Sequence, residues 1–155
     1  MKHVIAEMVV TATLGLTAPD MECIAKNIYF EARNQSHLGQ IAVAHVVLNR
    51  IVDERYPDTA CEVIKQGPTD STGFPKRHKC QFSWYCDGLS DVPKNDELWD
   101  IAQDRATEAV SLYGTYEDLT NGATHYHAKN VEPYWTSSLR RIMRVDDHIF
   151  YRWEE

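Results

Sequence analysis

Apolar positions recur with helical spacing in three stretches of the chain. Residues 20–33 gather their apolar side chains on one stripe and a smaller second patch, which predicts an amphipathic helix with Asp20 as its N-cap. Residues 38–55 are apolar on nearly every side, which predicts a central buried helix. Residues 96–113 predict a third helix, which Gly114 would stop.

Between the second and third helices the helical pattern is lost. Pro57 would end the second helix, and Thr59 with Glu62 forms a capping box that opens a short helix to Gln66. Residues 67–95 are rich in Gly, Pro, Ser and Asp, which predicts a long loop. A loop of this length inside a compact domain usually serves a function or covers a site.

The C-terminal part of the chain favours strands. Residues 123–128, 141–145 and 148–152 predict short strands, and Asp146-Asp147 would join the last two in a hairpin. We therefore expect an α+β fold, mainly helical, with a small antiparallel sheet or hairpin in the C-terminal part.

Length and charge limit the class of protein. A chain of 155 residues with 43% hydrophobic and 25% charged residues fits one globular domain, which we place at 19–155. Residues 1–18 have the outline of a signal peptide or weak signal-anchor, although a packed helix or strand explains the same sequence. A net charge of −7 argues against binding to nucleic acid or an anionic membrane, and no apolar run approaches the roughly 20 residues of a membrane span. We expect a monomer.

Four cysteines permit disulfides but do not fix their pairing. Cys80 and Cys86 lie six residues apart across a predicted turn and could be bridged, while Cys61 could reach either of them. Cys23 fits a small core position in the first helix. Four reduced thiols are an equal alternative.

Glu31 is the first candidate for chemistry. It projects between the two apolar patches of the first helix, one turn after Asn27, which could orient it. An unpaired carboxyl held against apolar neighbours has a raised pKa and can deliver a proton near neutral pH. The alternative is a glutamate that is ion-paired or exposed at the helix edge.

Aromatic and amide side chains gather in the segments without regular structure. Aromatic faces that stack on sugar rings, flanked by amides and hydroxyls, are what a glycan groove needs, although the same rings could close the edges of a small core. The residues concerned are Trp84, Tyr85, Tyr126, Tyr134 and Trp135, with Gln81, Ser83, Asn121 and Asn130 beside them.

Histidines raise the question of a metal. His125 and His127 would point to one face of a strand, and His148 could join them. No HExxH motif accompanies them, and the cysteines lack a zinc-binding spacing. Neither a P-loop nor a GxGxxG motif is present. We therefore expect no metal and no cofactor.

Five segments in the same order resemble the cell wall hydrolase family that includes the catalytic domain of spore cortex-lytic enzymes. They are residues 25–33 (AKNIYFEAR), 39–50 (GQIAVAHVVLNR), 80–84 (CQFSW), 122–127 (GATHYH) and 148–152 (HIFYR). The resemblance implies a lysozyme-like domain that cuts the glycan strand of peptidoglycan, with Glu31 as the catalytic acid. Where many relatives have Gly-Glu after the Glu-Ala-Arg motif, this chain has Asn34-Gln35, which puts a second carboxylate there in doubt.

The expected reaction is cleavage between N-acetylmuramic acid and N-acetylglucosamine, as a lytic transglycosylase or a muramidase with one catalytic glutamate. Expected substrate contacts are Gln81, Ser83, Trp84 and Tyr126, with His125 and Trp135, while Asn27, Asn49 and Arg50 would support the site. The alternatives are a zinc-dependent N-acetylmuramoyl-L-alanine amidase that uses the histidines, and a glycan-binding module without catalysis. The expected location is the periplasm or cell wall of a bacterium, reached by export or by phage delivery.

Overall fold

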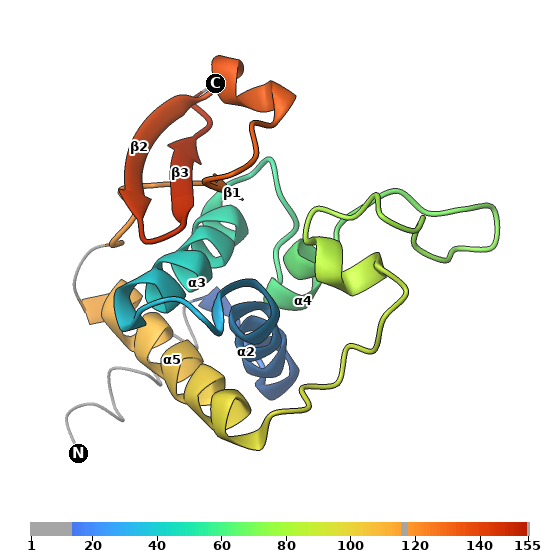
Figure 1. The fold of residues 1–155 in the computed structure, drawn as a ribbon, viewed down its shortest axis with the longest axis horizontal. Coiled ribbons are helices and arrows are strands. Elements are labelled where there is room, and N and C mark those ends of the chain that lie inside the picture. The colour runs from blue at the N-terminus through green and yellow to red at the C-terminus, as the bar shows by residue number, and fades with distance from the viewer. Residues whose placement is uncertain (1–13, 116–117, 155) are drawn as a thin grey trace.

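The computed structural model describes residues 14–115 and 118–154. Most of the expected N-terminal segment, residues 1–13, therefore lies outside the described residues. Figure 1 shows the helices on one side of α3 and a small sheet on its other side. The elements in chain order are α2 (Ala18–Ala32), α3 (His37–Val52), α4 (Ala60–Ile64), η1 (Ser83–Cys86), α5 (Asp96–Thr115), β1 (His125–Ala128), η2 (Tyr134–Ser138), β2 (Arg140–Val145) and β3 (His148–Arg152).

Helix α3 is the central element, as its sequence predicts. All of its residues from Gly39 to Ile51 are buried, because α2, α4 and α5 pack on one side of it and the sheet covers another. Ile24 and Ile28 of α2, Val47 of α3 and Val110 of α5 belong to the larger helical core. Within the described residues, no helix combines the length and apolar character needed to cross a membrane.

The sheet has three antiparallel strands in the order β1-β3-β2, with β3 in the middle. Phe150 of β3 is fully buried and packs with Ala42, Val43 and Val46 of α3 in a second, smaller core. The turn between β2 and β3 places Asp146 at φ +50°, a left-handed conformation that Asp tolerates. The expected α+β fold with a small antiparallel sheet is confirmed.

The helix boundaries differ from the sequence prediction for local reasons. Thr17, not Asp20, is the N-cap of α2, because its hydroxyl accepts from the Asp20 amide and the Asp20 carboxylate accepts from the Thr17 amide. Helix α3 ends at Val52, before Pro57, since Asp53 is already extended. Gly114 does not stop α5, which continues through it to Thr115.

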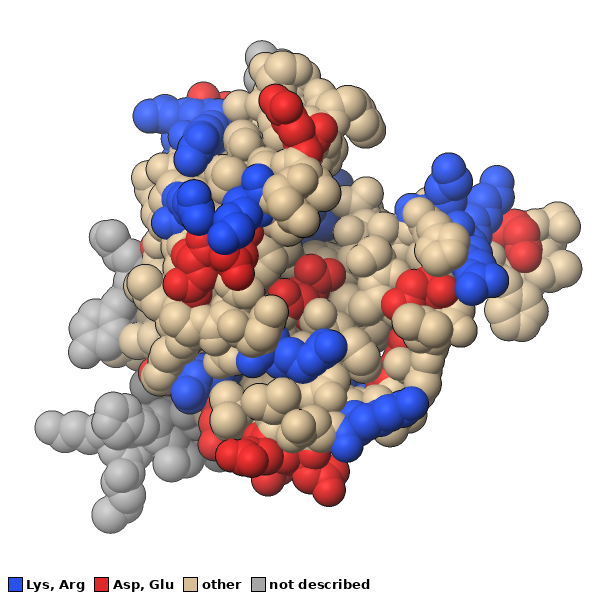
Figure 2. Space-filling model, in the orientation of Figure 1, with Lys and Arg blue, Asp and Glu red and all other residues tan. Residues whose placement is uncertain are grey.

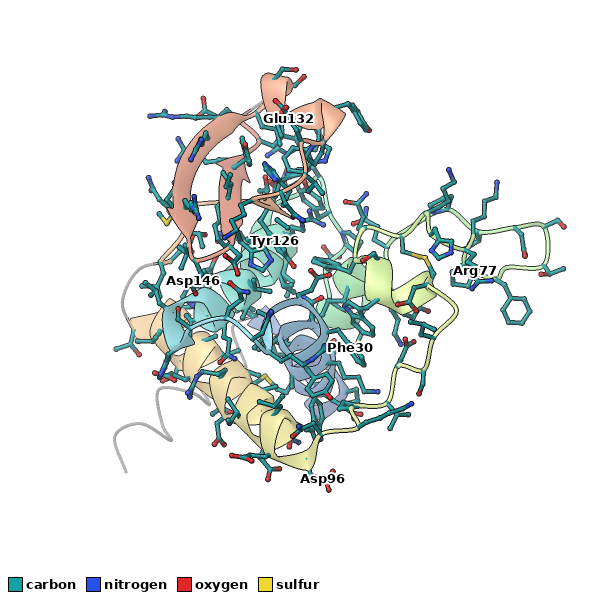
Figure 3. The ribbon with its side chains drawn as sticks, viewed as in Figure 1. Phe30, Arg77, Asp96, Tyr126, Glu132 and Asp146 are labelled. Atoms are coloured by element: carbon teal, nitrogen blue, oxygen red, sulfur yellow. A yellow bond between two sulfur atoms is a disulfide. The ribbon has the colours of Figure 1, made fainter. Side chains whose placement is uncertain are left out.

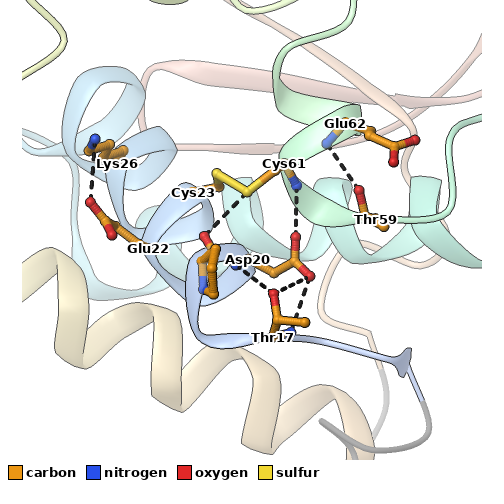
Figure 4. The surroundings of a disulfide bond; sticks show 9 residues. Thr17, Asp20, Glu22, Cys23, Lys26, Thr59, Cys61 and Glu62 are labelled. Atoms are coloured by element: carbon orange, nitrogen blue, oxygen red, sulfur yellow. Dashed lines mark hydrogen bonds and ion pairs between the residues drawn. A yellow bond between two sulfur atoms is a disulfide. The ribbon is translucent and has the colours of Figure 1, made fainter.

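Both pairs of cysteines are bridged. Cys80 is joined to Cys86, one of the pairings considered, whereas Cys23 is joined to Cys61 and is not a simple core residue. Figure 4 shows a contact beside this second bridge: the Asp20 carboxylate accepts from the Cys61 amide at 3.1 Å, which holds the start of α4 beside α2. The sequence spacing alone could not reveal this contact between two distant helix starts.

Candidate active site

A cavity of about 390 Å³ lies where the sheet meets the end of α2 and the loop after α4. Figure 3 places Tyr126 at this junction, and Figure 2 shows acidic atoms in the hollow between the sheet and the loop. The cavity is lined by Glu31, Arg50, Gln81, Phe82, Ser83, His125, Tyr126, His127, Ala128, Val131, Pro133, Trp135 and His148. The structure therefore gathers Glu31, Gln81, Ser83, His125, Tyr126 and Trp135 around one space.

Among the described residues that line this cavity, Glu31 is the only carboxylic acid. Its side chain is half-buried and forms no ion pair with any described residue. Burial raises the pKa of Glu31 to about 7, and an interaction with the Tyr126 hydroxyl opposes that rise. A carboxyl with this pKa is protonated in a large fraction of molecules near neutral pH, as a general acid must be.

A second cavity meets the first at Glu31. It measures about 350 Å³ and shares Glu31, Ala128 and His148 with the first one, while Asn130 and Asp147 belong to its far side. Glu31 thus has hollow surface on both sides. A polymer lying along the two cavities would pass over the carboxyl group.

Asn27 and Trp84 lie behind the carboxyl group. The indole nitrogen of Trp84 donates to the Asn27 side-chain oxygen at 2.9 Å, and its ring stacks on Phe30 at 4.8 Å between centroids. Trp84 is buried and lies outside the cavity lining, although the sequence analysis expected it to contact a sugar. The fully buried Asn27 amide nitrogen has no hydrogen-bond partner among the described residues.

Asn49 and Arg50 attach the last turn of α3 to the segment that enters β1. The Asn49 amide donates to the Asp118 carboxylate, the Thr120 hydroxyl and the Ala123 carbonyl, at 2.7–3.1 Å. The Arg50 Nε donates to the Thr124 carbonyl at 2.7 Å. Both residues therefore lie where a supporting role was expected.

The histidines of the cavity are held in an apolar, aromatic environment. Burial, with the nearby charges of Arg50 and Arg55, lowers the pKa of His125 to about 4, so its ring is neutral at neutral pH. His127 uses both ring nitrogens, one with the Ala128 carbonyl at 2.8 Å and one with the Tyr151 hydroxyl at 3.0 Å. In the part of the chain that the structure describes, no three His, Cys, Asp or Glu side chains are placed to hold a metal ion.

Several lining residues were not among the expected substrate contacts. Phe82, Val131 and Pro133 are apolar, and no chemical motif marks them, although Phe82 lies within residues 80–84, one of the five segments that carry the family resemblance. His127 and His148 were considered only as metal ligands. The pairing of β1 with β3 places these two histidines at neighbouring positions of the sheet. A prediction of this pairing from the sequence could therefore have identified them as site residues.

A family model for cell wall hydrolases matches residues 34–151. Glu31 precedes the matched range. Spore cortex-lytic enzymes of Oceanobacillus iheyensis and Halalkalibacterium halodurans are each 28% identical to the chain over 137 residues, which is 88% of it. The chain spans 42% and 36% of the length of these two relatives.

Two solved structures resemble the fold. The catalytic domain of the germination-specific lytic transglycosylase SleB from Bacillus anthracis superposes with a TM-score of 0.67 at 26% identity, covering 89% of this chain and 98% of that domain. The catalytic domain of the Bacillus cereus SleB protein gives 0.64 at 25% identity, covering 88% of this chain and 91% of that one.

Proposed function

The chain belongs to the cell wall hydrolase family, and from this premise we propose that it degrades peptidoglycan by cutting the glycan strand with Glu31 as the acid. The observation that carries the proposal is the position of Glu31, a single carboxyl with a pKa near 7 between two connected hollows. The resemblance to a lytic transglycosylase catalytic domain supports the same reaction class.

The proposed bond is the β-1,4 link between N-acetylmuramic acid and N-acetylglucosamine. Glu31 gives its proton to the bridging oxygen as the bond from C1 breaks and positive charge develops on the muramic acid ring. Gln81 and Ser83 are exposed on one wall of the first cavity and offer an amide and a hydroxyl to the sugars. Trp135 and Tyr126 offer ring faces and edges.

The number of acids in the first cavity favours the transglycosylase form of the second half of the reaction. Most glycosidases use two carboxyl groups, whereas Glu31 stands alone in the first cavity. In a transglycosylase Glu31, now ionised, accepts the proton of the sugar's own C6 hydroxyl while the C6 oxygen bonds to C1, which closes a 1,6-anhydro ring. No water is consumed, and Glu31 regains its proton.

Mass spectrometry of digested peptidoglycan separates the two forms of the proposal. Products with 1,6-anhydromuramic ends are expected. Products that carry one added water would reject the transglycosylase step and leave a muramidase with the same acid.

The role of Glu31 is tested by Glu31→Gln, which keeps the size of the side chain and removes the acidic proton. We expect clearing of peptidoglycan in a zymogram to be lost. The matched control is Glu22→Gln on the same helix, because Glu22 is exposed and pairs only with Lys26 at 3.4 Å. Full activity in Glu31→Gln would remove this residue from the mechanism.

The zinc amidase and the glycan-binding module remain testable alternatives. No observed ligand geometry favours the amidase, since His127 already uses both ring nitrogens. A chelator should leave the activity of a glycosidase with one glutamate unchanged, whereas a zinc amidase would lose its activity. The products of an amidase would also be released peptides rather than cut glycan strands. Binding without any clearing by the unmodified protein would favour the module.

We propose that the protein acts outside the bacterial cytoplasm, on wall or cortex peptidoglycan. Two disulfides among the described cysteines support this location, because disulfides persist in oxidising compartments. A fractionation that recovers the active, bridged protein from the cytoplasm would contradict it.

A further inference from the structure

Arg50 brings a positive charge to the first cavity without a carboxylate partner. Its side chain is only 4% exposed, yet no Asp or Glu of the described residues lies within ion-pair distance of it. It is also the only Lys or Arg among the residues that line the cavity. A buried cation is normally compensated by an anion, so this one needs explanation.

The guanidinium is held in a fixed position. Its Nε donates to the Thr124 carbonyl, and its Cζ lies over the rings of Tyr56 and Phe82, at 4.9 Å and 5.4 Å from their centroids. The group thus makes one hydrogen bond and two cation–π contacts. Packing therefore fixes Arg50 before any ligand arrives.

One nitrogen of this fixed group has no acceptor. Nη1 is buried and lacks a hydrogen-bond partner among the described residues. Buried polar atoms in folded proteins are nearly always paired, so an unpaired one calls for an explanation such as a catalytic role or a bound ion. An oxygen of a ligand in the cavity would satisfy it.

The charges around Arg50 favour an anionic ligand over a neutral one. His125 is neutral at neutral pH, and Glu31 is largely protonated when it acts as the acid. When Glu31 holds its proton, no carboxylate of the lining is ionised, while Arg50 carries a permanent positive charge. A carboxylate would both accept hydrogen bonds from the guanidinium and cancel this charge, while an acetamido carbonyl would only accept a hydrogen bond.

We propose that Arg50 binds a carboxylate of the peptidoglycan strand in the first cavity and thereby selects strands that carry one beside the cleaved bond. This inference rests on the proposed function. The carboxylate could belong to the lactyl group of muramic acid or to the peptide attached to it. Both sources share the chemistry that Arg50 recognises.

Ligand titration tests the proposal in the unmodified protein, followed by tryptophan fluorescence because Trp135 lines the cavity. The ligands are N-acetylmuramic acid and its methyl ester, then muramoyl dipeptide and its methyl ester. We expect at least one acid to bind about tenfold tighter than its ester, the gain expected of a charge-assisted contact. A preference for the first acid identifies the lactyl carboxylate, and a preference for the second identifies the peptide.

Two variants test whether Arg50 causes the preference for the acid over its ester. Arg50→Gln should bind acid and ester equally, while Arg141→Gln, which removes an exposed arginine of β2, should keep the preference. A preference that survives in a folded Arg50→Gln protein would overturn the proposal. Equal binding of acids and esters by the unmodified protein would overturn it without any variant.

Digestion of whole peptidoglycan completes the test. If the small ligands bind too weakly to measure, peptidoglycan is compared before and after methyl esterification of its carboxyl groups. A severalfold slower digestion of the ester is expected, and equal rates would overturn the role of Arg50 while leaving the proposed function intact. Acid-selective binding by a protein that digests no peptidoglycan would instead reject the proposed function and keep the carboxylate site.

Discussion

At the scale of single residues, the candidate site contains one carboxyl group whose environment favours its neutral form. Burial raises the pKa of Glu31 to about 7, although the Tyr126 hydroxyl pulls it in the opposite direction. The polypeptide therefore keeps an acid protonated at a pH where most glutamates are ionised. Two consequences can be measured, one in activity and one in stability.

Activity should fall as the pH rises through about 7, because ionised Glu31 has no proton to give. The measurement is kcat/KM on soluble glycan fragments across pH 5 to 9. Tyr126→Phe should move the alkaline limb to higher pH, since it removes the interaction that lowers the pKa of Glu31. The control is Tyr134→Phe, at a residue that is 94% exposed. A profile that stays flat to pH 9 would contradict the assignment of Glu31 as the acid.

The same pKa shift means that ionised Glu31 destabilises the folded protein. The folded protein holds the Glu31 proton up to about pH 7, whereas the unfolded chain releases it near 4.5, so stability falls as the pH rises through this window. Glu31→Gln should therefore raise the free energy of unfolding by about 1–3 kcal/mol at pH 8. The gain should disappear at pH 4, where both forms are uncharged. Denaturant titrations at the two pH values would detect it, and an equal effect at both would contradict the cause.

At the scale of elements, the start of α3 is fixed against the β2–β3 turn. The Asp146 carboxylate accepts from the Ser36 amide and hydroxyl, at 2.9 Å and 2.5 Å, where Ser36 caps the helix. Gly39 faces the same carboxylate, and a Cβ there would lie 2.6 Å from its oxygen. A residue with no side chain is needed for this approach.

Gly39→Ala should therefore destabilise the protein, although alanine is the better helix former. Alanine would add about 1 kcal/mol of stability through its helix propensity. Moving Asp146 would break the two hydrogen bonds that it accepts from Ser36, worth roughly 0.5–1.5 kcal/mol each, and leave a close contact. We expect a net loss of about 1–2 kcal/mol in chemical denaturation. In an Asp146→Gly background the sign should reverse, since the nearest obstacle is then gone and only the Gln35 Cβ, at 3.2 Å, stays close. A gain in stability in both backgrounds would contradict the close approach.

The two disulfides should differ in what they stabilise. Cys23–Cys61 closes 38 residues and joins α2 to α4, whereas Cys80–Cys86 closes only six. By loop-closure entropy their contributions are roughly 4 and 2 kcal/mol. Paired Cys→Ser variants should lower the melting temperature in that order. The smaller bridge should affect substrate binding more, because it closes the turn that carries Gln81 and Ser83 at the cavity. An equal loss of stability from both would contradict the loop-length argument.

At the scale of the whole molecule, α3 joins two cores. Its Val47 packs in the helical core, and its Val43 packs against Phe150 of the sheet. Asn49 strengthens this junction, since the Tyr113 hydroxyl of α5 donates to it while its amide bonds the segment that leads into β1. The site lies at the same junction, so helical and sheet parts must stay together for it to exist.

Asn49→Ala should destabilise the helical core and the sheet together. It leaves the Ala123 carbonyl and the Tyr113 hydroxyl without their partner, a loss of about 2–4 kcal/mol. We expect circular dichroism and tryptophan fluorescence to report one shared, lower melting temperature. Separate transitions for the two signals would show that the helical core and the sheet unfold independently. The control is Asn34→Ala, at an exposed residue after α2.

The periodic features of the sequence predicted the fold well. The continuous apolar run of α3 and the paired C-terminal strands are recognisable without a structure, because their burial depends on local pattern. Glu31 is a candidate from the sequence because its helix leaves a gap between apolar patches, and its role stays a prediction. The Cys23–Cys61 bridge and the burial of Trp84 could not be predicted, since both depend on contacts between elements far apart in the chain. The monomeric state stays a prediction, to be measured by light scattering.

The loop between α4 and α5 has a tip that bonds mainly to itself. Thr69 and Pro75 form an isolated antiparallel β-bridge. The Asp70 amide donates to the Phe74 carbonyl, and the Lys76 amide donates to the Pro68 carbonyl. Figure 2 shows basic side chains gathered over this loop, well away from the helices. A loop tip whose hydrogen bonds are mainly internal can be replaced as a unit. Under the proposed function, chimeras that take residues 68–76 from relatives should change which wall surfaces the protein approaches, while Glu31 and its pKa stay as they are.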